Sequence, residues 1–210
     1  MRTSRLQGRP WLSLVLVCTG LALVSLASNW VSVSELEGQI QVFSFLRKTV
    51  SKLVNCGTVW AGIGVFAGWL MSRPTISVVA AVLAAEGTLA FHYGLGQLVG
   101  MYNVGIWAEN THWFILGVLA CAPLGLVGWV ARRPGWPGLV AGLVVPVGAV
   151  AEPWVRTWLL QPSFLPWPER WAGVACGLVL TVAGLAGAWL VTRKKILAGR
   201  AGKAHPQAPR

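Results

Sequence analysis

The stretch "LVNCGTVWAGIGVFAGWLMSRP", residues 53–74, contains no charged side chain before Arg73. An apolar run of about 20 residues is long enough to cross the hydrocarbon core of a bilayer as a helix. The run closes with Trp, Arg and Pro, which are typical of a helix end at a membrane surface. This stretch therefore predicts a membrane-spanning helix that is followed by a reversal of the chain.

The composition of the whole chain agrees with a membrane protein. Of its 210 residues, 55% are hydrophobic and only 11% are charged, and the mean hydropathy is +0.64. The formal net charge of +11 comes from 17 Lys and Arg against 6 acids, all of them Glu. These cations lie between apolar runs and at the chain ends, which is typical of membrane-protein loops and not of a nucleic-acid-binding surface. We therefore expect the lipid bilayer, and no nucleic acid, as a partner.

Six apolar runs of this kind divide the chain. Alternating strand-like patterns are missing, and only helices satisfy their own backbone groups in lipid. We therefore predict an all-α fold, a polytopic transmembrane helix bundle with about six spans at residues 11–29, 53–71, 75–97, 113–131, 138–158 and 171–192. Residues 1–27 can also be interpreted as a cleaved signal peptide, because arginines precede the first apolar run.

The distribution of Lys and Arg predicts the orientation. Cations near helix ends are retained in the cytoplasm, and an N-terminus inside places twelve of the 17 cations on the cytoplasmic side. We therefore expect a multi-pass protein of the cell membrane with both termini cytoplasmic. Anionic lipid is the expected partner of the basic cytoplasmic ends.

Two segments lie outside the six runs. Residues 34–52 place apolar side chains on one helical face and charged ones on the other, which predicts an amphipathic helix on the outer membrane surface. An extension of the second span and a docking site for a partner are the alternatives. Residues 193–210 combine Gly, Ala and Pro with scattered cations, which predicts a basic, disordered cytoplasmic tail.

The chain also contains an approximate internal repeat. The motif "GWLMSRP" at residues 68–74 returns as "GWVARRP" at 128–134, and "VVAAVLAAEG" at 78–87 resembles "VVPVGAVAEP" at 144–153. Two helix hairpins of the same orientation would form a parallel repeat. The alternative is convergence on sequences that are common in membrane proteins. In a true repeat, Glu86 and Glu152 are equivalent.

These two glutamates are the main candidates for a functional site. Glu152 has a partner at the favourable i,i+4 spacing, Arg156. Glu86 has no such partner, and an unpaired charge at the bilayer centre costs about 3 kcal/mol. We therefore expect Glu86 either to bind a proton or to face a polar cavity. The alternative is a protonated packing residue that makes a hydrogen bond.

Further polar candidates lie near the same predicted helix ends: Asn55, His92, Tyr93, Glu109 and His112. On a helix Tyr93 shares the face of Glu86, whereas His92 points away, so we expect no direct relay from Glu86 to His92. His92, Glu109 and His112 have no recognised metal-site spacing, and the four cysteines are dispersed. No metal or cofactor is expected. Since no catalytic motif is visible, the sequence leans away from an enzyme.

The motifs just described, with "FHYG" at 91–94 and "WFILGVLACAPLGLVGWVARRP" at 113–134, carry a family resemblance. Over about residues 54–155 the chain resembles an uncharacterised family of small multi-pass integral membrane proteins of high-GC Gram-positive bacteria. The matching positions are Asn55, Trp60, Tyr93, Pro123, Gly125 and Gly128. The resemblance implies no known activity, and the segment before Asn55 departs from it.

Two functional hypotheses follow. The first is a carrier-like or proton-responsive membrane element in which Glu86 faces an internal cavity, a role for which a homo-oligomer would supply additional helices. The second is a non-transporting assembly or regulatory subunit that presents residues 34–52 and the basic tail to an unidentified membrane partner.

Overall fold

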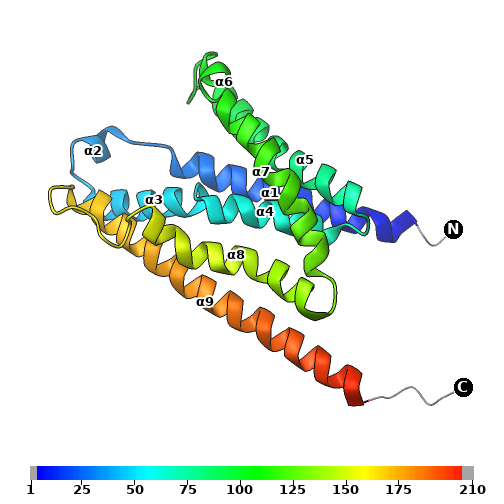
Figure 1. Cartoon of the computed structure of the whole chain (residues 1–210). Helices are drawn as coiled ribbons and strands as arrows, with labels where there is room; N and C mark the ends of the chain where they lie inside the picture. Colours follow the sequence, from blue (N-terminus) through cyan, green and yellow to red (C-terminus); the bar gives the residue numbers. More distant parts are fainter. Residues whose placement is uncertain (1–3, 205–210) are drawn as a thin grey trace, which may run out of the picture.

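The structure, a computed structural model, describes the backbone of residues 4–204 and the side chains of residues 9–197. This part of the chain folds into helices without any strand, so the predicted all-α fold is confirmed (Figure 1). The helices are α1 (Ser4–Ser28), α2 (Val33–Leu36), α3 (Gln41–Val54), α4 (Gly57–Leu70), α5 (Pro74–Leu98), α6 (Ile106–Glu109), α7 (Thr111–Ala131), α8 (Gly135–Val155) and α9 (Trp167–Ala204).

The helix lengths identify a multi-pass membrane protein. Five helices are long and apolar enough to cross a membrane: Arg9–Ser28 within α1, then α5, α7, α8, and Trp167–Leu197 within α9. Together α3 and α4 are also long and apolar enough, but they meet at a bend of 43°. The described chain therefore contains five spans, or six when the bent pair counts as one. The first span belongs to the bundle, because Leu14, Cys18 and Ala22 are buried in its core.

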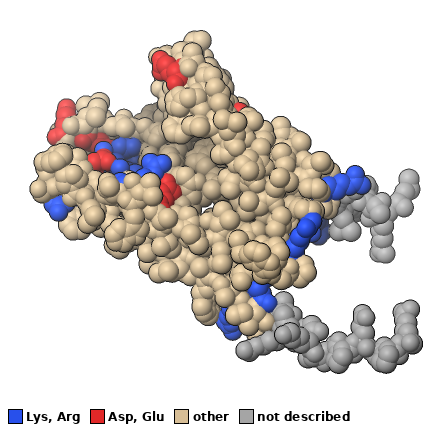
Figure 2. Space-filling model, in the orientation of Figure 1, with Lys and Arg blue, Asp and Glu red and all other residues tan. Residues whose placement is uncertain are grey.

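The two ends of the bundle differ in charge. We call the end that holds the start of α1, the end of α9 and the turns α4–α5 and α7–α8 the terminal end, and the opposite end the distal end. In Figure 2 only Lys and Arg colour the terminal end, whereas acids and bases both colour the distal end. Terminal cations hold the turns: Arg132 donates to the Met71 carbonyl at 2.8 Å.

The predicted surface helix at residues 34–52 takes a different position. The segment forms the short α2 and then α3, which packs along α1 and α9 and continues into α4. Its cations point into the protein: Arg47 pairs with Glu35 at 2.6 Å, and Lys48 pairs with Glu169 at 2.9 Å. This is the arrangement of the second interpretation, an extension of the second span. The ion pairs explain it, because they give the charged face of α3 partners inside the protein.

The prediction of a disordered tail at 193–210 is wrong for residues 193–204, because α9 continues without a break to Ala204. Residues 205–210 lie outside the described residues. Lys and Arg favour helix, and the Lys195 ammonium donates to the carbonyls of Ala131 at 3.1 Å and Arg133 at 2.6 Å. These bonds fasten α9 to the last residue of α7 and to the turn that follows it.

The parallel helices α4 and α7 make a close contact near the terminal end of the bundle. A side chain on Gly68 would collide with the carbonyl of Gly125, and one on Gly128 would collide with the carbonyl of Val65. Small residues permit such backbone contact between membrane helices. Moreover, Gly68 and Gly128 are 60 residues apart, and so are Val65 and Gly125. The two contacts are therefore equivalent when the two hairpins are exchanged. The two hairpins therefore meet in a pseudo-symmetric way, which supports the parallel repeat.

We predict that Gly68→Ala destabilises the protein, since the new methyl group must push α4 away from the α7 backbone. Overpacking of this kind costs about 1–3 kcal/mol. Thermal unfolding of the purified protein in detergent should therefore shift to lower temperature. The matched control is Gly87→Ala in α5, where an added Cβ meets no atom within 4 Å. Equal melting temperatures for the two variants would contradict the close contact.

We predict that the Glu35–Arg47 pair makes stability depend on pH. The side chain of Glu35 is only 3% exposed, and the Arg47 guanidinium beside it lowers the pKa of this carboxyl below its ordinary value. The stabilisation is thus present above the ordinary Glu pKa of about 4.3 and disappears as the pH falls through the lowered value. Glu35→Gln should melt below wild type at neutral pH, and the difference should close in acid. A constant difference across this range would contradict the prediction.

Candidate functional site

The break in the second span is held together by one carboxylate. The first backbone N–H groups of a helix have no partner within it, and inside a membrane they must be satisfied by the protein. Glu152 of α8 accepts hydrogen bonds from the amide nitrogens of Gly57 at 2.8 Å and Thr58 at 2.7 Å. It also accepts from the Thr58 hydroxyl at 2.6 Å. The negative carboxylate at this helix start also suits the helix dipole.

The same carboxylate pairs with Arg156, whose Nε lies 2.8 Å from Oε1 of Glu152. The predicted pair is thereby confirmed. The bonds to α4 are an addition that the sequence did not reveal. Glu152 therefore has four hydrogen-bond donors around it, and its side chain is 11% exposed. It joins the second hairpin of the repeat to the first.

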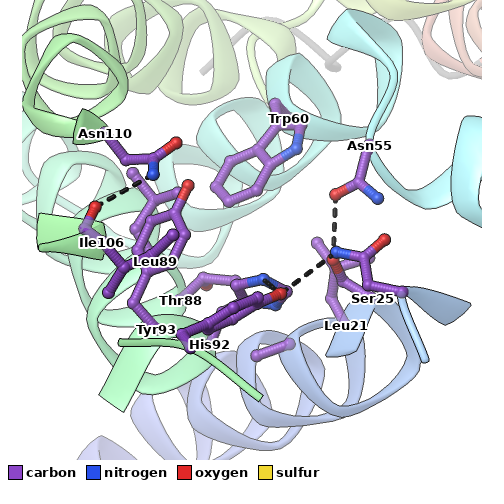
Figure 3. Close-up of a pocket in the computed structure, with 13 residues that line it drawn as sticks. Leu21, Ser25, Asn55, Trp60, Thr88, Leu89, His92, Tyr93, Ile106 and Asn110 are labelled. Carbon is purple, nitrogen blue, oxygen red and sulfur yellow. Dashed lines mark hydrogen bonds between the residues drawn. The ribbon is translucent and has the colours of Figure 1, made fainter. Parts of the chain in front are cut away.

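A polar cavity of about 230 Å³ lies beside this break, toward the distal end. We call it the distal cavity, and Figure 3 shows most of its lining. It is formed by α1, α4, α5 and the segment around α6. The lining residues are Leu21, Ala22, Ser25, Asn29, Asn55, Trp60, Thr88, Leu89, His92, Tyr93, Tyr102, Ile106 and Asn110.

Hydrogen bonds between different helices fix the polar groups of the distal cavity. Ser25 of α1 donates to the side-chain oxygen of Asn55 at 2.9 Å, which ties α1 to the break in the second span (Figure 3). On the other side, the Tyr102 hydroxyl lies 3.0 Å from Nε2 of His92 and accepts from Asn29 at 3.3 Å. The cavity wall is therefore assembled from three separate segments of the chain.

Tyr102 reaches this position because the chain reverses directly after α5. Gly100 has a φ of +76°, the left-handed conformation that commonly ends a helix. The ring of Tyr102 then packs against Gly96, where a side chain would collide with it. Nearby, Trp107 donates to the side-chain oxygen of Gln97 at 2.8 Å and anchors α6 to the end of α5.

A second cavity, of about 390 Å³, adjoins the first and shares Asn55, Trp60, Leu89 and Tyr93 with it. We call it the lateral cavity. Its other walls come mainly from α7, and among the described residues Arg156 is the only charged one that lines it. The remaining lining residues are Gly57, Ala61, Trp113, Leu116, Gly117, Ala120, Cys121, Leu124 and Arg156.

Glu86 lines neither of these two cavities. It faces α7, where its Oε1 atom is close to the position that a Gly117 side chain would occupy. This oxygen is buried and has no hydrogen-bond partner within the described residues. Tyr93 faces the same helix through its contact with Phe114, as the shared face predicts.

The repeat explains why the two glutamates differ. Glu86 lies against Gly117 as Glu152 lies against Gly57, and these two glycines are again 60 residues apart. Gly57 begins α4, so its N–H is free to bind a carboxylate. Gly117 lies six residues inside the start of α7, at Thr111, where amide hydrogens are used within the helix.

The structure brings together three of the five secondary candidates. Asn55, His92 and Tyr93 line the distal cavity. Glu109 and His112 are exposed at the distal end and line neither cavity. Within the described residues, no group of three or more His, Cys, Asp or Glu side chains could hold a metal ion.

Sequence reasoning missed Thr88 in the middle of α5 and four other polar residues of the distal cavity: Ser25, Asn29, Tyr102 and Asn110. All four lie near predicted helix ends, where interfacial polar residues are ordinary. A weak signal was present, because uncharged polar side chains accumulate at the distal ends of the first and third runs.

Comparisons with family models, with curated proteins and with solved structures gave no match. The resemblance over residues 54–155 stays a prediction.

We predict that Glu152→Gln lowers stability, because an amide provides one acceptor oxygen where the carboxylate provides two, and no charge. A buried donor left without a partner costs about 1–3 kcal/mol. Thermal unfolding in detergent should show the loss. Glu109→Gln is the control, since Glu109 is exposed at the same end. If both variants melt like wild type, Glu152 does not hold the start of α4.

Proposed function

We propose that this chain is a carrier-like integral membrane protein that binds a small solute in the distal cavity. The observation that supports it best is the position of this cavity at a broken span. Irregular backbone at membrane depth is tolerated where it is buried in protein or lines a cavity, and transporters place binding sites at broken helices. Here the break at Asn55 borders the distal cavity directly.

The lining suggests the class of solute. In the part of the chain that the structure describes, no Lys, Arg, Asp or Glu lines the distal cavity, whereas Trp60 and Tyr93 offer flat apolar surfaces. Amide, hydroxyl and imidazole groups supply donors and acceptors around them. Such a site suits a small uncharged molecule with hydrogen-bonding groups and an apolar body.

We place the protein in the cell membrane with both termini in the cytoplasm, so that the distal cavity opens to the outside. The excess of Lys and Arg at the terminal end supports this orientation. Anionic lipid would contact these cations in the cytoplasmic leaflet. A homo-oligomer would add helices around the cavity.

Glu86 is proposed as a proton-responsive element that is separate from the solute site. Its buried oxygen has no partner among the described residues and lies between α5 and α7. Charge at this position would therefore disturb the contact between the two helices, and proton binding would relieve it. Since α5 also carries His92 and Tyr93, a change in this contact would reach the distal cavity.

A non-transporting subunit is the second proposal. One observation favours it: α3 exposes an apolar strip made of Val42, Phe43, Leu46 and Val50. This strip would meet lipid in a carrier and a partner helix in an assembly subunit. The charged face of α3 is already paired within the protein and is not available to a partner.

We predict that Asn55→Cys reacts with a membrane-impermeant thiol reagent added from the distal side, because the proposed site is open to water. The four native cysteines are buried. Leu119→Cys is the control, because Leu119 is exposed on α7, away from both cavities, where we expect lipid. Labelling of both variants, or of neither, would contradict a water-filled solute site.

Thermal-shift screening of the purified protein with uncharged amphipathic solutes would then identify a solute. We predict that Tyr102→Phe weakens its binding about fivefold, since one hydrogen bond contributes about 1 kcal/mol. His112→Gln, outside the cavity, should bind as wild type.

We predict that uptake of the solute into proteoliposomes loses its pH dependence in Glu86→Gln, whereas this variant still binds the solute. Binding without uptake in any condition would favour the subunit proposal.

A further inference from the structure

The lateral cavity has a shape that the solute site does not require. Its walls come from α4, α5 and α7, and Arg156, the residue that follows α8, lies at its edge. Helices α7 and α8 diverge from their shared turn at the terminal end (Figure 1). Along α7, four of the cavity's lining residues recur every three or four positions: Trp113, Leu116, Ala120 and Leu124. They therefore form one continuous stripe on the helix. Trp113 and Leu116 are each 49% exposed, so the cavity is open on this side.

The length of the stripe corresponds to one leaflet of a bilayer. From Trp113 to Leu124 the helix rises about 16 Å. The hydrocarbon core of a bilayer is about 30 Å thick, so a single leaflet accounts for about half of it. Trp113 lies at the distal end of the stripe, where an indole ring suits the headgroup layer. An acyl chain of the distal leaflet would therefore fit along this stripe.

The distal end of the lateral cavity carries hydrogen-bond donors of Arg156 that have no acceptor among the described residues. Arg156 donates through Nε to Glu152, while no described residue accepts a hydrogen bond from its two terminal nitrogens. Its side chain is 46% exposed. The Glu152 carboxylate, in contrast, is already bonded to the start of α4 by three donors. The guanidinium therefore has free donors that match a phosphate group.

We propose that the lateral cavity binds one anionic phospholipid of the distal leaflet. Its phosphate would contact the terminal nitrogens of Arg156, and one acyl chain would lie along the stripe on α7. The paired Glu152 sets the position of the guanidinium. This site goes beyond the proposed function, because solute binding depends on the distal cavity and its His92–Tyr102 pair.

The test is native mass spectrometry of the full chain after reconstitution in vesicles of equal phosphatidylglycerol and phosphatidylcholine. Wild type should retain one phosphatidylglycerol per chain. Arg156→Gln should lower this retention about tenfold or more, because a charge-assisted hydrogen bond is about twice as strong as a neutral one. Arg170→Gln is the matched control, because Arg170 belongs to the same end of the bundle and does not line the cavity. It should retain the lipid.

A second variant separates lipid binding from the ion pair with Glu152. Ala120→Leu fills the stripe without touching Arg156 and should also lower retention. Val118→Leu is its control, since Val118 is on α7 and lines neither cavity. Size-exclusion chromatography would show that each variant is folded.

Three results would overturn the proposal. Equal retention of the two lipids would show that charge does not select the ligand. Undiminished retention in folded Ala120→Leu would show that the acyl chain lies elsewhere. Stabilisation of the protein by inorganic phosphate as strongly as by phosphatidylglycerol would make Arg156 an anion site without an acyl chain. None of these results bears on solute binding, which Tyr102→Phe tests separately.

Discussion

The fold depends on the demand that every backbone N–H within a bilayer finds a partner. The second span breaks between Val54 and Gly57, and α4 therefore begins with unpartnered donors inside the bundle. The carboxylate of Glu152 satisfies two of them. Because Glu152 belongs to α8, this one side chain also fixes the position of α8 relative to α4. Both cavities lie beside the contact.

The close approach of α4 and α7 is the second constraint. Gly68 and Gly128 allow the backbones of α4 and α7 to touch near the terminal end. From their shared turn α7 and α8 diverge toward the distal end, and both cavities lie on the distal side of the glycine contact. The cations at the terminal end, such as Arg132 and Lys195, hold the turns by bonding to carbonyls.

The sequence predicts the spans well because each run is long, apolar and closed by Arg, Trp or Pro. Local spacing also predicts the Glu152–Arg156 pair, which is a contact within one helix. The contact between Glu152 and Gly57 joins residues 95 positions apart, and no local pattern encodes it. The rest of the cavity lining was missed for the same reason: Ser25, Asn29 and Tyr102 join the predicted Asn55 and His92 only when separate segments pack together.

Two predictions, the surface helix at residues 34–52 and the disordered tail at 193–210, assumed that charged segments are exposed or disordered. The cations of residues 34–52 find Glu35 and Glu169 inside the protein, and the predicted tail is helical through Ala204. Glu86 shows the opposite case: the sequence identified an isolated acid correctly, and it has no partner among the described residues. Its side chain lies against Gly117 of α7, however, and does not itself line either of the two cavities.

The two equivalent glycine contacts between α4 and α7, which are related by 60 residues, have an evolutionary consequence. A hairpin whose two ends lie on the same side of a membrane can be copied in tandem without inverting either copy. The surfaces that now join the halves are then those by which two identical hairpins would have associated as a symmetric dimer. On this view the present chain descends from such a dimer by gene fusion. Divergence then left one glutamate with helix amides to bind and the other without them.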